Sequence, residues 1–137
     1  MEQQKLLDVE IITPQMVIYS GKAQSVSVPG SKSPFQVLNM HAPIVSTLET
    51  GLTRIVDEDE QEHWFATGAG FTEIHKNKVS ILVENAFDGA DLDLNALNEE
   101  LSQSQTALHE EKNNEQIKNS ILETENKIKA AAKHKGV

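Results

Sequence analysis

The spacing of apolar residues changes once along this chain, in the short acidic segment 86–93, and this change limits the possible folds more than any other feature. Before the segment, apolar residues form short runs or alternate, which is typical of strands. After it they recur every three or four positions, which is typical of helices. The sequence therefore predicts a β domain over 1–86, a hinge over 87–92 and a helical domain over 93–137. The hinge function is assigned to Asp88, Gly89, Asp91 and Asp93.

The first domain is predicted to contain about nine short strands, separated by turn residues every eight to twelve positions. That spacing favours a flattened β-sandwich or barrel over alternating strands and helices. Aromatic residues are few, so the core must consist mainly of valine, isoleucine and leucine, which suits strands. The strands are expected at 6–12, 16–19, 23–28, 35–38, 44–48, 52–56, 62–67, 71–74 and 79–83.

The second domain is predicted to be an antiparallel pair of helices, over 93 to about 111 and about 115 to 133. Asn113, with Gln116 three residues later, resembles a capping signal for the second helix. Each helix carries a narrow apolar seam of the kind that pairs with one neighbour. The seam positions are Leu97, Leu101, Ser104 and Leu108 in one helix and Ile117, Ile121, Thr124, Ile128 and Ala131 in the other.

The helical pair has few large apolar residues, and this suggests two alternative behaviours. In the first, it exchanges between a form folded on the β domain and a form extended along a partner, using the same seams for both. In the second, it is permanently docked. Residues 91–111 hold six acids and no lysine or arginine, whereas 117–137 hold five lysines and two acids. Four of them, toward the C-terminal end, complement the helix dipole and could also meet an acidic surface: Lys127, Lys129, Lys133 and Lys135.

Composition narrows the function classes. A net charge of −9 argues against nucleic-acid or anionic-lipid binding, which requires clustered lysine and arginine. Without cysteine there is no disulfide framework and no zinc-thiolate site. The N-terminus has no signal-peptide core and no segment is long enough to span a membrane, so the protein is expected in the cytoplasm, without lipid insertion.

No catalytic motif is found. The acidic run 57–60 lacks the glycine and glutamate of a calcium-binding loop, and Gly68-Ala69-Gly70 precedes a strand, so it is not a phosphate-binding loop. The histidines have no metal-binding spacing and no metal is expected. They are His41, His63, His75, His109 and His134. The sequence is interpreted as that of a non-enzyme.

Several segments, in order, resemble the epsilon subunit of F-type ATP synthases. The central one is 39–45 followed by 48–55, which is similar to the "HAP…G…RI" segment of that family. Supporting segments are Gly21 with 26–30, 65–74, 79–86 and 91–93. Each motif is short, but their order and spacing cover nearly the whole chain.

This resemblance implies a ten-stranded flattened sandwich in the central stalk of the enzyme, at the cytoplasmic face of the bacterial inner membrane. The sandwich would join the gamma subunit and the membrane c-ring, coupling the ring to the catalytic core during proton-driven synthesis. The helices would reach the alpha and beta subunits and inhibit ATP hydrolysis. The ring-contact loop would contain Ser31, Lys32, Ser33, Pro34, Met40 and His41, and the inhibitory basic residues would be Lys118, Lys127, Lys129 and Lys133.

This chain departs from the family pattern in ways that bear on ligands. Pro34 replaces a residue that is often acidic, and Gln36 and Met40 replace glycines. Some family members bind ATP through an LDxxRA motif, but here Ala96 stands at the arginine position. Arg54 is the chain's only arginine, so the second helix has no guanidinium for a triphosphate. We therefore expect ATP binding to be weak or absent, and no other cofactor.

One alternative function remains: a free-standing β-sandwich binding module that dimerises through its helical hairpin. The two hypotheses differ in one structural expectation. The rotor hypothesis predicts an apolar strip on the sandwich surface when the gamma subunit is absent, whereas the binding-module hypothesis predicts none.

Overall fold

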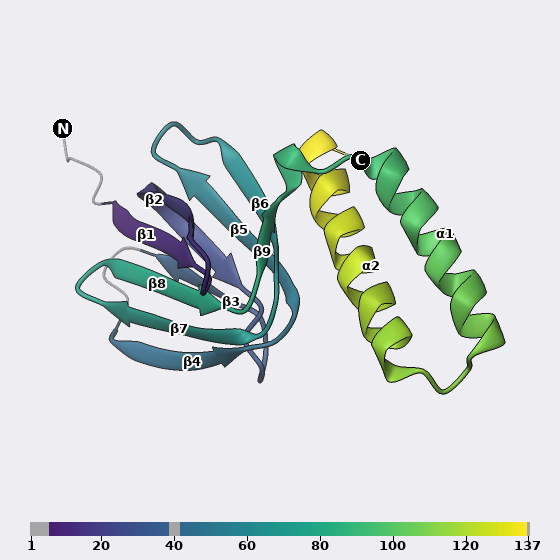
Figure 1. Cartoon of the computed structure of the whole chain (residues 1–137). Helices are drawn as coiled ribbons and strands as arrows, with labels where there is room; N and C mark the ends of the chain where they lie inside the picture. The colour runs from purple at the N-terminus through teal and green to yellow at the C-terminus, as the bar shows by residue number, and fades with distance from the viewer. Residues whose placement is uncertain (1–5, 39–41, 137) are drawn as a thin grey trace.

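The computed structural model describes residues 6–38 and 42–136 of the 137-residue chain and shows a β-sandwich followed by two helices (Figure 1). The described strands are β1 Leu7–Ile12, β2 Val17–Val28, β3 Phe35–Leu38, β4 Ile44–Leu48, β5 Gly51–Asp57, β6 Glu62–Thr67, β7 Gly70–His75, β8 Lys78–Val83 and β9 Ala86–Asp88. A 3-10 turn, η1, covers Gly89–Asp91, and the helices are α1 Leu94–Glu110 and α2 Glu115–Lys135. The predicted sandwich followed by a helical pair is confirmed.

The strands form one sheet that folds over on itself, in the order β4-β7-β8-β1-β2-β5-β6-β9, with β3 also paired to β2. Strand β2 belongs to both layers: its first half pairs with β1, and its second half pairs with β3 and β5. The sequence prediction placed two strands here, split at Ser20-Gly21, and that split is wrong. Gly21 instead lies opposite Val9 inside one long strand, because β1 pairs with β2 continuously through this position.

The layers enclose a core of aliphatic side chains around Phe65. The largest fully buried members are Phe65, Leu7, Ile11, Ile55, Ile74 and Ile81. They lie at alternate positions of their strands, so every strand that contributes them also has an outward row. A bridge between Gly30 and Leu48 joins the loop after β2 to the end of the edge strand β4.

The segment at which the apolar period changes is itself structured. Phe87 and Asp88, which the sequence analysis placed in the hinge, lie in β9, paired with Ala66 and Phe65 of β6. The Asp88 side chain then accepts a hydrogen bond from the Ala90 N–H and begins η1. Short strand β9 was missed because its three residues follow no alternating pattern that a sequence reading can separate from a loop.

The helices begin at capping side chains. Asp93 accepts hydrogen bonds from the Asn95 and Ala96 N–H groups at the start of α1. Asn114, not the predicted Asn113, caps α2 by accepting from the Ile117 N–H at 3.1 Å. The error is one residue, because the two asparagines are adjacent and only one has the extended backbone of a cap. Helix α2 ends at Gly136 in a left-handed conformation.

Helix α2 lies between α1 and the sandwich (Figure 1). Helix α1 packs along α2, and the seam residues Leu97, Ile121, Thr124 and Ala131 are all buried. A different stripe of α2 faces β5, β6, β9 and η1. The side-chain contacts between α2 and the sheet described below come from this stripe, and exchange of the helices between two positions stays a prediction. From here on, α1 and α2 together are called the arm.

Candidate interaction surfaces

The outer face of β7, β8, β1 and β2 carries a continuous apolar row. Strand register places Phe71 beside Leu82, Leu82 beside Ile12 and Ile12 beside Val17. Phe71 is 44% and Val17 53% exposed, and Met16, next to Val17 in the chain, is 61% exposed. Such a row across four strands is a contiguous patch rather than scattered surface residues. We call Ile12, Val17, Phe71 and Leu82 the bare row.

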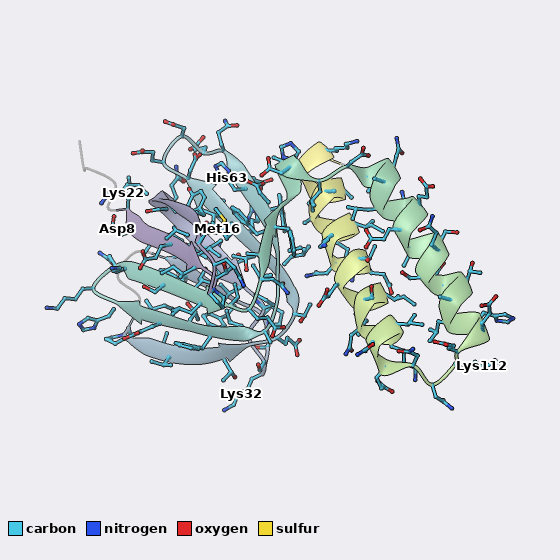
Figure 2. The ribbon with its side chains drawn as sticks, viewed as in Figure 1. Asp8, Met16, Lys22, Lys32, His63 and Lys112 are labelled. Carbon is cyan, nitrogen blue, oxygen red and sulfur yellow. The ribbon has the colours of Figure 1, made fainter. Side chains whose placement is uncertain are left out.

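Beside the bare row, the same face is charged and internally paired. Lys22 lies 2.5 Å from Asp8, and Lys78 lies 3.5 Å from Glu10, which also accepts a hydrogen bond from the Ser80 hydroxyl. Figure 2 shows Asp8 and Lys22 together on this side of the sandwich. An open hollow of about 280 Å³ lies over these residues. The charged side chains that line this hollow are already paired with one another, so the hollow is a poor site for a charged ligand. The paired charges can instead orient a protein partner that docks on this face.

The opposite face of the sandwich is covered by α2 through polar and small residues. The Asn126 amide donates to the Gly51 carbonyl at 2.8 Å, and the Lys127 ammonium lies 4.0 Å from the centre of the Phe87 ring. Next to them, Ala130 is fully buried, and a Cβ on Gly89 would overlap the Ala130 carbonyl. This close backbone approach is possible only because Gly89 has no side chain.

The C-terminal end of α2 meets an aromatic and charged cluster. Lys133 lies 5.4 Å from the centre of the Trp64 ring, and Arg54 lies 5.7 Å from the same ring. Arg54 also forms an ion pair with Glu62. The hydrogen bond from Arg54, with a smaller contribution from the Lys133 charge, holds the pKa of Glu62 below its ordinary value. Arg54, the only arginine of the chain, therefore links β5 to β6 beside the C-terminal end of α2.

The acidic turn 57–60 is ordered by one of its carboxylates. Asp57 accepts from the Asp59 and Gln61 N–H groups and lies 2.8 Å from His63 Nε2. The hydrogen bond with His63 is the main reason that the pKa of Asp57 is lowered. Across residues 6–38 and 42–136, no three histidine or acidic side chains are grouped so as to hold a metal ion.

The four predicted inhibitory lysines have different surroundings. Lys127 and Lys133 contact rings of the sandwich, as described above. Lys118 lies 3.5 Å from Glu115 on its own helix, and Lys129 is exposed. The structure thus does not gather them into one cluster.

The predicted ring-contact loop is described in part. Ser31, Lys32, Ser33 and Pro34 are exposed, and Lys32 projects from the lower edge of the sandwich in Figure 2. The other predicted members, Met40 and His41, lie outside the described residues. The predicted hinge residues are placed in succession: Asp88 ends β9, Gly89 and Asp91 form η1, and Asp93 caps α1.

Sequence reasoning missed the residues that join the arm to the sheet. Asn126, Lys127, Ala130 and Lys133 follow the same three- and four-residue spacing as the seam, but they are polar or small. A search for apolar periodicity therefore passes over them. One sequence feature could have indicated this second packing surface. Ala130 and Ala131 are both small and, as consecutive helix residues, face different directions, which indicates close neighbours on two sides of α2.

Comparisons with known proteins identify the sandwich. Residues 6–89 match the family described as ATP synthase, Delta/Epsilon chain, beta-sandwich domain. The ATP synthase epsilon chain of Magnetococcus marinus is 37% identical over 91 residues, which are 66% of each chain. That of Brevibacillus brevis is 36% identical over 88 residues, 64% of this chain and 67% of the relative. This chain thus spans about two thirds of the length of these relatives.

A third relative resembles the sandwich alone. The ATP synthase epsilon chain of Chlorobaculum tepidum is 39% identical over 80 residues, which are 58% of this chain but 91% of the relative. That protein is therefore about 88 residues long, with no room for a comparable arm.

Solved structures share the fold. A chain of the Euglena gracilis mitochondrial ATP synthase (OSCP/F1/c-ring) superimposes with a TM-score of 0.69 at 14% identity, covering 90% of this chain and 75% of that one. A chain of the Tetrahymena thermophila mitochondrial ATP synthase central stalk and c-ring gives 0.52 at 16% identity, covering 66% and 72%. At these identities the likeness shows the fold, and the first match extends into the arm.

Proposed function

The chain belongs to the delta/epsilon family of ATP synthase chains, and from that premise we propose that it is a central-stalk subunit of a proton-driven ATP synthase. In this role it links the membrane c-ring and the gamma subunit to the catalytic core and contributes no catalytic residue. Its place is peripheral, at the cytoplasmic face of a bacterial inner membrane. In the described residues, neither helix has the length and apolar character needed to cross a bilayer.

The bare row is the observation that supports this function best. A rotor subunit must stay bound to the gamma subunit as the rotor turns, so it needs an apolar surface that remains covered in the complex. The bare row offers such a surface across four strands, with paired charges beside it. We assign the gamma subunit to this face. The alternative of a free-standing module gives no reason for the row.

The loop at residues 31–34 is the proposed contact with the c-ring. Its four residues are exposed and include one lysine, which suits contact with a polar ring loop. The arm lies beside β5, β6 and β9, so neither the bare row nor this loop is covered by it (Figure 1).

The arm is the proposed regulatory element. In its docked position, Lys127 and Lys133 contact Phe87 and Trp64 of the sandwich, and we infer that they meet the alpha or beta subunits only when these contacts break. Inhibition of ATP hydrolysis therefore requires the arm to leave the sheet. Strong ATP binding is not part of the proposal, because Ala96 stands where the binding motif has arginine and Arg54 is paired with Glu62.

The direct test adds the purified chain to its ATPase core depleted of this subunit, next to a truncation that ends at Ala90. The Chlorobaculum relative, which is about as long as the sandwich, supports the use of this truncation. Both proteins should bind, and only the full chain should slow hydrolysis. Binding by both without slowing would refute the inhibitory arm, and binding by neither would favour the free-standing module.

A further inference from the structure

The turn between β4 and β5 holds the loop that follows β2. The Ser31 N–H donates to the Thr47 carbonyl at 3.0 Å, and the Glu49 N–H donates to the Pro29 carbonyl at 3.0 Å. These bonds, on either side of the bridge from Gly30 to β4, tie the base of loop 31–34 to this turn. The loop base and the turn are therefore joined by backbone hydrogen bonds on both sides of the bridge.

Gly51 is the point at which the turn and Pro29 are packed most closely. A Cβ on Gly51 would lie 2.7 Å from the Pro29 Cβ, closer than real side chains approach. Pro29 is buried and its ring is rigid, so the two residues have little room to move independently.

The same residue holds the arm. The Gly51 carbonyl accepts a hydrogen bond from the Asn126 amide at 2.8 Å, and that amide also lies 3.5 Å from the Thr67 carbonyl. The Thr67 hydroxyl contacts the Gly51 carbonyl as well, at 3.4 Å. One side chain of α2 thus joins the ends of β5 and β6, at the residue that touches Pro29.

We propose that the β4–β5 turn couples loop 31–34 to the arm: a contact that displaces the loop shifts the Gly51 carbonyl, weakens its bond to Asn126 and lowers the docked population of the arm. The two-state element is the arm, docked or released, and both sites act on its equilibrium. Coupling of this kind is reciprocal, so release of Asn126 also changes the loop. The identity of the displacing partner, the c-ring, rests on the proposed function, whereas the coupling belongs to this chain alone.

The expected effect is moderate, because α2 docks through polar contacts that water can replace. Loss of a hydrogen bond of this type changes an equilibrium by roughly fivefold. We expect Asn126→Ala to lower the ratio of docked to released arm by about that factor. Pro29→Ala acts only through the turn and should lower the ratio by roughly threefold.

The experiment measures this ratio by electron paramagnetic resonance in the full-length isolated chain. The sequence has no cysteine, so spin labels attach only at introduced ones. Leu122→Cys on α2 and Glu73→Cys on β7 are both at exposed positions. Pro29→Ala should broaden the distance distribution toward longer values, whereas Pro34→Ala, in the exposed part of the loop, should not. In the Asn126→Ala background, Pro29→Ala should have no further effect.

The proposal is contradicted if Pro29→Ala leaves the distribution unchanged, or if its effect simply adds to that of Asn126→Ala. Pro29 is buried, so a second measurement covers the case in which its replacement impairs folding. In Asn126→Ala, the amide resonances of Ser31 and Lys32 should shift, whereas Glu125→Ala on the exposed side of α2 should leave them unchanged. Unshifted loop resonances in Asn126→Ala also contradict the coupling. Both measurements omit the ATPase core, so failure here is distinct from failure of the proposed function.

Discussion

The two outer faces of the sandwich differ in how they are covered. One face carries the bare row, which is apolar and has no neighbour within the described chain. The other face is covered by α2, whose contacts are an amide hydrogen bond, two lysine-to-ring contacts and a buried alanine. Apolar surface favours a permanent partner, since its exposure to water is costly. Polar contacts exchange with water at small cost and therefore favour reversible docking.

This difference separates the proposed structural role from the proposed regulatory one within about 88 residues of sandwich. Helix α1 packs along α2, and the seam residues Leu97, Ile121 and Thr124 are buried. We therefore expect the arm, where it leaves the sheet as proposed, to do so without opening the hairpin.

The largest expected effect is on the bare row. Phe71→Glu places a charge at the β7 end of the row, on one of its most exposed side chains, and should weaken binding to the ATPase core by about 100-fold, equivalent to roughly 2.7 kcal/mol. Glu73→Gln, which lies on the same strand and face, serves as the control and should change binding little. Titration of labelled chain into the core measures both. If the Phe71 and Glu73 variants bind the core with equal affinity, the bare row is not the binding surface, and the proposed difference between the two faces is wrong.

Gly89→Ala tests the covered face without altering any residue of the arm. The new methyl group overlaps the Ala130 carbonyl, and overpacking of this kind costs about 1–3 kcal/mol, so the docked arm should become roughly tenfold less populated. Ala90→Ser, one residue later and exposed, should leave docking intact. Spin-label distances between α2 and the sandwich report the result. If Gly89→Ala keeps the arm docked, the close approach at this joint does not determine docking.

The lysine contacts should have smaller effects. Lys127→Ala removes the contact with Phe87 and should lower the docked ratio by roughly two- to fivefold, because exposed contacts of this type contribute about 0.5–1 kcal/mol. Lys133→Ala should have a weaker effect, since its ammonium lies farther from the Trp64 ring. Lys129→Ala is the matched control and should have none. An effect of Lys129→Ala as large as that of Lys127→Ala would indicate general charge rather than ring contact.

The smallest expected effect depends on pH. Because Arg54 lowers the pKa of Glu62 in the folded state, the folded protein holds this proton less tightly than the unfolded chain. The resulting stability is present above the unfolded pKa and is lost as the pH falls through the folded pKa. Glu62→Gln should therefore be less stable than the wild type near neutral pH and nearly equal to it in strong acid. Urea unfolding across that range checks the sign, and a constant difference at all pH values would contradict it.

Much of the fold follows from the sequence, because its patterns are local. Alternation identified most strands, and the seam residues identified the helical pair and its mutual packing. The continuity of β2 through Gly21 could not be foreseen, since Ser20-Gly21 is a normal turn signal. Its extended conformation depends on β1, which pairs alongside it.

The surfaces were less predictable than the fold. The bare row combines Phe71, Leu82, Ile12 and Val17 from four strands, and only the register between those strands places them side by side. Asn126 gave no signal at all, because its partner is a backbone carbonyl 75 residues away. Contacts of this kind depend on tertiary structure and not on residue type.

Hydroxyl-radical footprinting of the full chain, free and bound to its ATPase core, compares the two faces in one measurement. We expect Phe71, in the bare row, and Met16, beside it, to be oxidised readily in the free chain and to become protected on binding. Phe87 and Trp64, whose rings contact Lys127 and Lys133 of α2, should show no such protection by the core, and should react faster wherever the arm has left the sheet. Equal oxidation of Met16 and Phe71 in the free and bound chain would contradict the account.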